Sequence, residues 1–152
     1  MTRRSLLLAL CLIFLSGCQD GAEDMTAKVV GTWKYDTDTL RLELAPDLRK
    51  DMEAHGDKGA AAMEKSKAGL IKSVQSLVFV FNADGTMQFG MAKTPEMPIA
   101  KGKWFARGRS INLEMITPGQ TVPDMTIEPD GQRIKTVTKG DFGAGYIDLV
   151  KQ

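Results

Sequence analysis

The chain has 152 residues, with 20 lysines and arginines against 19 aspartates and glutamates. This near balance lacks the broad basic excess of a nucleic-acid-binding protein, so no nucleic-acid partner is expected. The length suits a single folded domain, and the two cysteines and one histidine offer little material for a zinc site or a thiol nucleophile.

The first 17 residues are typical of a secretory signal peptide. Arg3 and Arg4 precede an uncharged apolar run from Leu6 to Leu15. A membrane-spanning helix needs roughly 20 apolar residues, about twice the length of this run, whereas a short apolar core behind a basic start indicates a signal peptide. Removing residues 1–17 takes away both arginines and no acid, so 18 basic and 19 acidic residues remain.

The apolar run ends in Leu15-Ser16-Gly17-Cys18, which resembles the lipobox of bacterial lipoproteins. The resemblance covers the first 18 residues. It implies a diacylglyceryl group with palmitate-type chains on Cys18 and cleavage just before this residue. Each buried methylene contributes ~0.8 kcal/mol, and two chains hold a protein stably, so the membrane is the expected partner of the N-terminus. Gln19 in place of Asp implies the outer membrane, facing the periplasm, in a Gram-negative host.

The mature chain is expected to consist of a tether and one domain. Cys11 leaves with the signal peptide and Cys18 carries lipid, so no thiol remains for a disulfide. Residues 18–27 are small and acidic after the cysteine, which predicts a flexible tether. Residues 28–152 form the predicted domain, which must rely on an apolar core.

The first half of the domain predicts one strand and two helices. Residues 29–35 have the β-propensity of a strand. Residues 39–45 alternate like a strand. Leucines in the same region also recur every four residues, as on a helix, and the predicted helix runs to about Ala54. The two patterns leave two possible starts for this helix, near residue 38 or near residue 46. Residues 60–76 predict a second helix, whose apolar face carries Met63, Leu70, Ile71 and Val74.

From residue 77 onward the pattern predicts only short strands joined by brief turns. Asp84-Gly85 and Asp130-Gly131 supply the positive φ that tight hairpins need. This spacing predicts a mainly β protein, an antiparallel up-and-down meander closing into a small barrel of about eight strands, with the two helices inserted between the first and second strands. The helices are expected to cover one open end. The expected strands are 77–81, 86–91, 101–107, 111–115, 125–127, 134–138 and 146–150.

Three short motifs resemble lipocalin-like (calycin-type) domains: Gly31-Thr32-Trp33, the segment 81–86, and Gly102-Lys103-Trp104. The likeness covers roughly residues 28–150 and implies a β-barrel. The sequence departs from the lipocalin pattern in two ways. It inserts a helical pair after the first strand, and it offers only Lys151 where lipocalins stack an arginine on the first tryptophan. The resemblance does not identify a ligand.

Catalytic and metal motifs are nearly absent from the sequence, so no enzyme, cofactor or metal is expected. His55 sits among helix-stop signals and is expected in solvent. Met87, Met91 and Met97 lie near one another in sequence and thioethers can bind Cu(I), but ordinary core and loop methionines are favoured. Lys58, Lys65 and Lys72 form one helical stripe that faces either lipid headgroups or water.

The inward face of the predicted barrel is the candidate ligand site. An eight-stranded barrel either fills itself with side chains, the favoured alternative here, or holds one small ligand. The functional expectation is a lipid-anchored envelope lipoprotein whose barrel binds or shields a small apolar ligand; the alternative is a filled barrel that contacts an envelope protein. The candidate contacts are Phe79, Phe81, Met87, Phe89, Met91, Trp104, Leu113, Met115 and Met125, with Ile127 on the same face.

Overall fold

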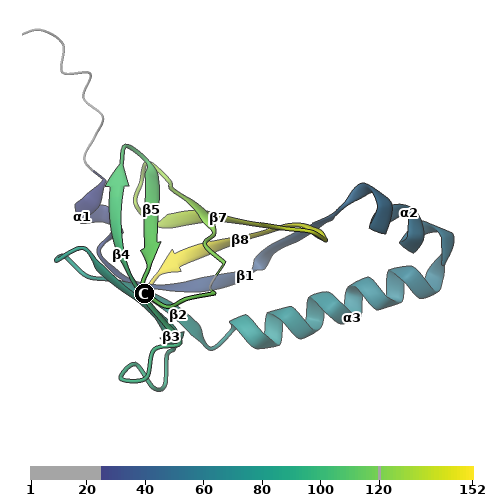
Figure 1. Ribbon diagram of the computed structural model, residues 1–152, viewed down its shortest axis with the longest axis horizontal. Coiled ribbons are helices and arrows are strands. Elements are labelled where there is room, and N and C mark those ends of the chain that lie inside the picture. Colours follow the sequence, from purple (N-terminus) through teal and green to yellow (C-terminus); the bar gives the residue numbers. More distant parts are fainter. Residues whose placement is uncertain (1–24, 120) are drawn as a thin grey trace, which may run out of the picture.

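The chain folds into a closed β-barrel (Figure 1). A computed structural model describes residues 25–119 and 121–152. Eight antiparallel strands follow one another around the barrel in chain order, and the last pairs with the first, which confirms the predicted up-and-down barrel with two helices between its first two strands. The strands are β1 (Gly31–Leu44), β2 (Leu77–Phe81), β3 (Thr86–Met91), β4 (Ala100–Arg107), β5 (Ser110–Met115), β6 (Asp124–Ile127), β7 (Arg133–Gly140) and β8 (Gly143–Lys151); the helices are α1 (Thr26–Val29), α2 (Pro46–Ala54) and α3 (Asp57–Val74).

The first strand starts later and ends later than predicted. Val29 ends the short helix α1, and Gly31, with a φ of 135°, turns the chain into β1. The predicted strand over 29–35 was therefore wrong at its start. The alternating residues 39–44 belong to the strand, and residues 41–44 pair with β8 as far as Leu44 opposite Gly143. The next helix begins at Pro46, where a proline in the first turn costs no helical hydrogen bond.

The hairpin between β7 and β8 is longer than predicted. Its turn is formed by Asp141 and Phe142, because Gly140 still pairs with Gly143. Gly143 has a φ of 131°, and a Cβ atom at this position would collide with the carbonyl oxygen of Glu43. Only glycine therefore allows β1 to approach β8 this closely.

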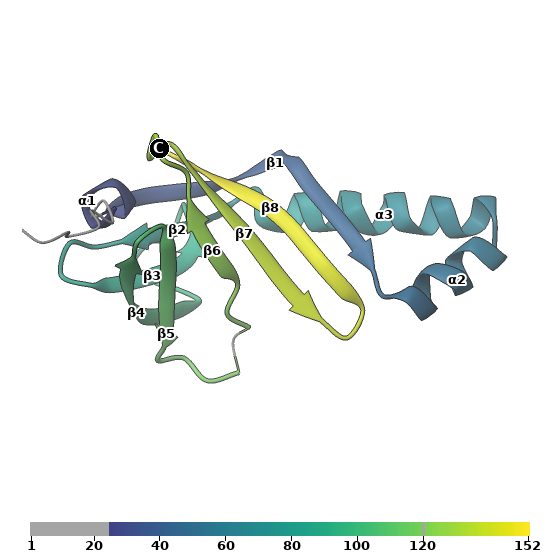
Figure 2. The ribbon, with the colours of Figure 1, turned by 90° about the horizontal axis from the view of Figure 1, so that it is seen from above.

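The helices project from the barrel. We call the outer parts of β1 and β8 (residues 41–44 and 143–146), together with α2 and α3, the arm. In both views α2 lies at the tip of the arm and α3 returns toward the barrel (Figures 1 and 2). None of the residues of α2 is buried, and α3 buries only Gly59. The expectation that the helices cover an open end was wrong, since only the last turns of α3 reach it. Within the described ranges, no helix is long and apolar enough to cross a membrane.

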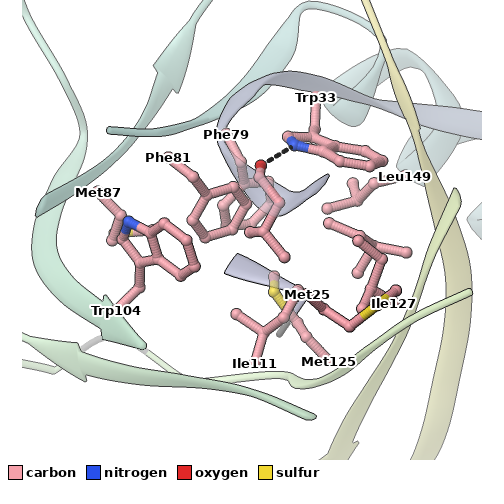
Figure 3. Close-up of a cluster of buried hydrophobic side chains, with 12 residues drawn as sticks. Met25, Trp33, Phe79, Phe81, Met87, Trp104, Ile111, Met125, Ile127 and Leu149 are labelled. Atoms are coloured by element: carbon pink, nitrogen blue, oxygen red, sulfur yellow. Dashed lines mark hydrogen bonds between the residues drawn. The ribbon is translucent and has the colours of Figure 1, made fainter. Parts of the chain in front are cut away.

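The opposite end of the barrel is closed by α1 and filled with side chains (Figure 3). Met25 and Val29 of this end are 1% and 0% exposed. The Trp33 indole donates a hydrogen bond of 2.7 Å to the carbonyl oxygen of Val29. Met25 and Val29 therefore pack in the core although both precede the first strand. The buried cluster comprises Met25, Val29, Trp33, Phe79, Phe81, Met87, Trp104, Ile111, Met125, Ile127, Ile134 and Leu149.

Candidate ligand-binding site

The open half of the barrel holds a small inner cavity of about 100 Å³. Part of its wall is loop, because β5 and β6 pair through only two residue pairs and then diverge. Thr121 and Pro123 of the connecting loop complete the wall at this gap. The cavity is lined by Tyr35, Phe79, Phe89, Ala100, Leu113, Met115, Thr121, Pro123 and Thr138.

A larger hollow of about 280 Å³ lies outside the barrel mouth, between the end of α3 and strands β1, β7 and β8. We call it the outer cleft. It shares Tyr35 and Thr138 with the inner cavity, so these two side chains stand between the two spaces. Its walls are otherwise almost entirely aliphatic. The lining residues are Tyr35, Leu40, Leu70, Val74, Thr138, Gly145 and Ile147.

A bend in β1 shapes the outer cleft. The pairing of β1 with β8 shifts register between Asp36 and Arg41, as at a β-bulge. The Thr39 hydroxyl donates to the Asp36 carbonyl oxygen at 2.7 Å and accepts from the Asp148 backbone N–H at 2.8 Å. This side chain replaces the missing ladder bonds. As a result Leu40, which is 6% exposed, forms part of the cleft wall.

An ion-pair cluster fixes the same bend from the outer face. Arg133 Nη1 lies 2.7 Å from Asp36 Oδ2 and 3.3 Å from Asp148 Oδ2, so one guanidinium joins β7 to β1 and β8. Hydrogen bonds to Asp36 first, and then to Asp148, raise the pKa of Arg133 above its usual value. All three side chains are partly exposed, so solvent weakens the attraction and the cluster mainly sets geometry.

Tyr35 is the one ionisable residue that lines either space among the residues that the structure describes. Its ring lies edge-on to Phe79, with the centroids 5.8 Å apart. Burial raises the pKa of the Tyr35 phenol to about 12, so the hydroxyl stays protonated at neutral pH. Among the described residues no side chain or backbone group hydrogen-bonds this hydroxyl. The site can therefore offer a neutral hydrogen-bond donor in apolar surroundings.

The predicted contact residues divide between the packed core and the inner cavity. Phe79, Phe89, Leu113 and Met115 line the cavity. Four other predicted contact residues are buried in the core of the closed end, together with Ile127, and their side chains fill this half of the barrel. These four residues are Phe81, Met87, Trp104 and Met125. Met91 is 42% exposed at the end of β3, so its expected inward place was wrong.

Several residues of the two spaces were missed from the sequence. Strand alternation was the signal that could have found Tyr35, because this residue follows Trp33 by two positions and so shares its face of the strand. Leu70 and Val74 were assigned to an apolar helix face, but the pattern did not reveal which surface this face would meet. Leu40 was missed because a register shift cannot be deduced from alternation.

The remaining predicted residues do not gather at this site. Leu15, Ser16, Gly17 and Cys18 lie outside the described residues. His55 is exposed at the end of α2, and among the described residues no three histidines, cysteines or acids form a potential metal site. Met87 is buried whereas Met97 is 72% exposed, so the two thioethers lie in different surroundings. The stripe of Lys58, Lys65 and Lys72 is exposed along α3.

Comparison with known proteins adds one similar structure. No protein-family model matches the chain, and no curated protein matches its sequence. The chain is similar in structure to a DUF4847 family protein from Bacteroides vulgatus, with a TM-score of 0.49 and 17% sequence identity over 84% of this chain and 96% of that chain. At this level of similarity no property of that protein transfers to this chain.

Proposed function

We propose that this protein is a lipid-anchored envelope lipoprotein with a lipocalin-like barrel whose open end binds a small apolar ligand. The observation that carries the proposal is the meeting of two hollows at Tyr35, one inside the barrel and one under α3. Together they offer a small inner space lined by aromatic, aliphatic and hydroxyl side chains, beside an outer cleft whose walls are mainly aliphatic. Ligand sites are typically concave and apolar with a few polar groups, as here.

The lipocalin-like part of the proposal is supported at the closed end of the barrel. Lys151 Nζ lies 5.4 Å from the centre of the Trp33 ring and donates a hydrogen bond of 2.8 Å to the Lys28 carbonyl oxygen. A cation from the end of β8 therefore covers the first tryptophan. Lipocalins use an arginine for this contact, and Lys151 takes its place in this chain.

The lipid anchor is supported by the signal peptide and lipobox, and it sets an orientation. Six residues separate Cys18 from Met25, so the two residues lie at most ~25 Å apart when this segment is fully extended. Met25 lies at the closed end, and the arm extends from the other end (Figures 1 and 2). We infer that the closed end faces the membrane and the ligand site faces the periplasm.

The anchor is tested by fractionation of cells that express the Cys18→Ala variant. The wild-type protein should stay in the membrane fraction after high-salt and alkaline washing, and metabolic labelling with palmitate should mark it. The variant should lack the label and its signal peptide should not be cut at residue 18. A Cys11→Ala variant is the matched control and should behave as wild type, because Cys11 lies within the signal peptide. A Cys18→Ala protein that is still processed and wash-resistant would overturn the anchor.

Ligand binding is tested on residues 19–152, which contain the complete barrel. A fluorescent apolar probe should bind, and native mass spectrometry after gentle purification should detect a bound small molecule. Leu70→Asp should weaken probe binding about tenfold, since it places a charge on the cleft wall. Ala68→Asp puts the same charge on an exposed position about 200° around α3 and should leave binding unchanged. Equal affinities of both variants would argue against this site.

A second role, contact with an envelope protein, is favoured by the arm. Phe142 at the β7–β8 turn is 77% exposed, and α2 buries none of its residues. Photocrosslinking in cells from position 142 should trap one dominant protein if the arm is an interface. The same crosslinker at Asp84, in the turn between β2 and β3 at the closed end, is the control. A matching adduct pattern at both positions would contradict this role.

A further inference from the structure

The chemistry of the two spaces narrows the class of ligand. No charged side chain lines either the inner cavity or the outer cleft among the described residues. The polar side chains on their walls are hydroxyls, those of Tyr35, Thr121 and Thr138. All three line the inner cavity, whereas the outer cleft is aliphatic apart from the two hydroxyl residues at its junction with the cavity. The polar end of a ligand therefore has its partners inside, and the apolar end has its partners outside.

Size supports the same orientation. The inner cavity of about 100 Å³ has room for a few heavy atoms only, while the outer cleft of about 280 Å³ has room for a short apolar chain. Leu40 and Ile147 from the strands and Leu70 and Val74 from α3 would contact such a chain along its length. A compact polar group with one chain attached fits this shape.

Charge then selects the kind of polar group. An ionised carboxylate or phosphate is strongly disfavoured in an apolar site without a counter-charge. The inner cavity offers none, and the Tyr35 hydroxyl, which stays protonated, can donate only a neutral hydrogen bond. Carbonyl and hydroxyl oxygens accept such a bond without carrying a charge.

We propose that the ligand is an uncharged amphiphile with a single apolar chain, such as a fatty alcohol or a fatty ester. Its carbonyl or hydroxyl oxygen lies in the inner cavity and accepts a hydrogen bond from Tyr35, and its chain lies in the outer cleft. This inference rests on the proposed binding function and makes Tyr35 the residue that distinguishes neutral lipids from fatty-acid anions.

The test is displacement of a fluorescent apolar probe from residues 19–152 by four ligands of equal chain length: octanol, methyl octanoate, octanoate and octane. At pH 8 octanol and methyl octanoate should displace the probe at concentrations at least about tenfold below octanoate. Tyr35→Phe should weaken octanol and methyl octanoate about three- to tenfold and leave octane unchanged, because only the oxygen-bearing ligands lose a hydrogen bond.

Tyr146→Phe is the matched control. The Tyr146 hydroxyl donates to Glu43 Oε2 at 3.0 Å on the arm and lines neither space, so all four ligands should bind this variant as they bind the wild type. Equal affinities for octanoate and octanol, or an unchanged octanol affinity in Tyr35→Phe, would overturn this inference while leaving apolar binding in place. Failure of every ligand to displace the probe, octane included, would overturn the proposed site itself.

Discussion

Thr39 holds the bend of β1 with its side chain where the strand ladder is interrupted. Its hydroxyl bonds both the Asp36 carbonyl oxygen and the Asp148 backbone N–H. The hydroxyl is thus the local substitute for backbone pairing. The sequence does not reveal this role of Thr39, because the role depends on the register shift between β1 and β8.

Thr39→Val should lower the free energy of unfolding by about 1–2 kcal/mol, because the shape is kept while the partly buried Asp148 N–H loses its acceptor. Urea denaturation followed by tryptophan fluorescence measures the change. Thr37→Val is the control, since the Thr37 hydroxyl makes no hydrogen bond within the described residues. If Thr39→Val cost no more stability than Thr37→Val, the hydroxyl would not hold the bend.

Two carboxylates at the closed end predict a pH dependence of stability. A hydrogen bond from Lys135, whose Nζ lies 2.6 Å from Glu128 Oε1, is the main cause that lowers the pKa of Glu128 below its usual 4.5. Hydrogen bonds from the Thr86 side chain and backbone lower the pKa of Asp84 below its usual 3.8. A group with a depressed pKa in the folded state stabilises the fold above its ordinary pKa, and this stabilisation is lost as the pH falls through the folded value.

The urea midpoint should therefore fall as the pH drops below about 4.5, and Glu128→Gln should make this fall less steep. Denaturation curves at several pH values between about 3 and 7 measure it. Asp141→Asn is the comparison, because Asp141 is exposed and forms no ion pair within the described part of the chain. A Glu128→Gln profile as steep as the wild-type profile would contradict the assignment.

At the level of elements, the arm depends on how closely β1 approaches β8. The two strands remain paired from Arg41 opposite Tyr146 to Leu44 opposite Gly143. Arg41 also lies over the Tyr146 ring at 4.4 Å, and Tyr146 donates to Glu43. These exposed contacts contribute little stability individually. Backbone pairing between β1 and β8 therefore stabilises the arm, and Gly143 is the residue on which this pairing depends most.

Gly143→Ala should break the outer pairs of the arm, because the added Cβ would meet the Glu43 carbonyl oxygen and the φ of 131° disfavours alanine. Hydrogen–deuterium exchange should rise in residues 41–44 and 143–146 and stay unchanged in the core strands. Gly140→Ala is the control from the same hairpin, since a Cβ there meets nothing within 4 Å. Unchanged protection of the arm in Gly143→Ala would show that the strands can separate without losing their pairing.

At the level of the whole molecule, the barrel has two unlike ends. The closed end contains both tryptophans and the residues of α1, while the open end carries the two hollows and the arm. In the proposed anchored state the closed end lies near the lipid and the open end lies away from it. On this proposal, the ligand binds in the open half of the barrel and the packed core lies in the closed half.

Met25→Ala should destabilise the whole barrel by about 2–5 kcal/mol, because Met25 is 1% exposed in the shared core although it precedes the first strand. Met97→Ala makes the same chemical change at a position that is 72% exposed and should shift stability by less than ~0.5 kcal/mol. Thermal and urea unfolding compare them. Equal stability of the two variants would mean that the residues before β1 do not belong to the core.

The sequence by itself predicted a signal peptide and a lipobox, and it determined the number and order of the strands and the hairpins at Gly85 and Gly131. These features depend on local chemistry, namely alternation of apolar residues and the freedom of glycine to adopt positive φ. The inward places of Phe79, Phe81 and Met87 followed from the same alternation, and the structure confirms them.

Only the tertiary structure decided which half of the barrel is filled and where the open space lies. The packing of Met25 in the core, the bend at Thr39 and the meeting of Leu70 with Tyr35 at one cleft all depend on contacts between residues distant along the chain. Local patterns carry no information about which surfaces meet, since an apolar helix face or strand face has the same periodicity whatever covers it.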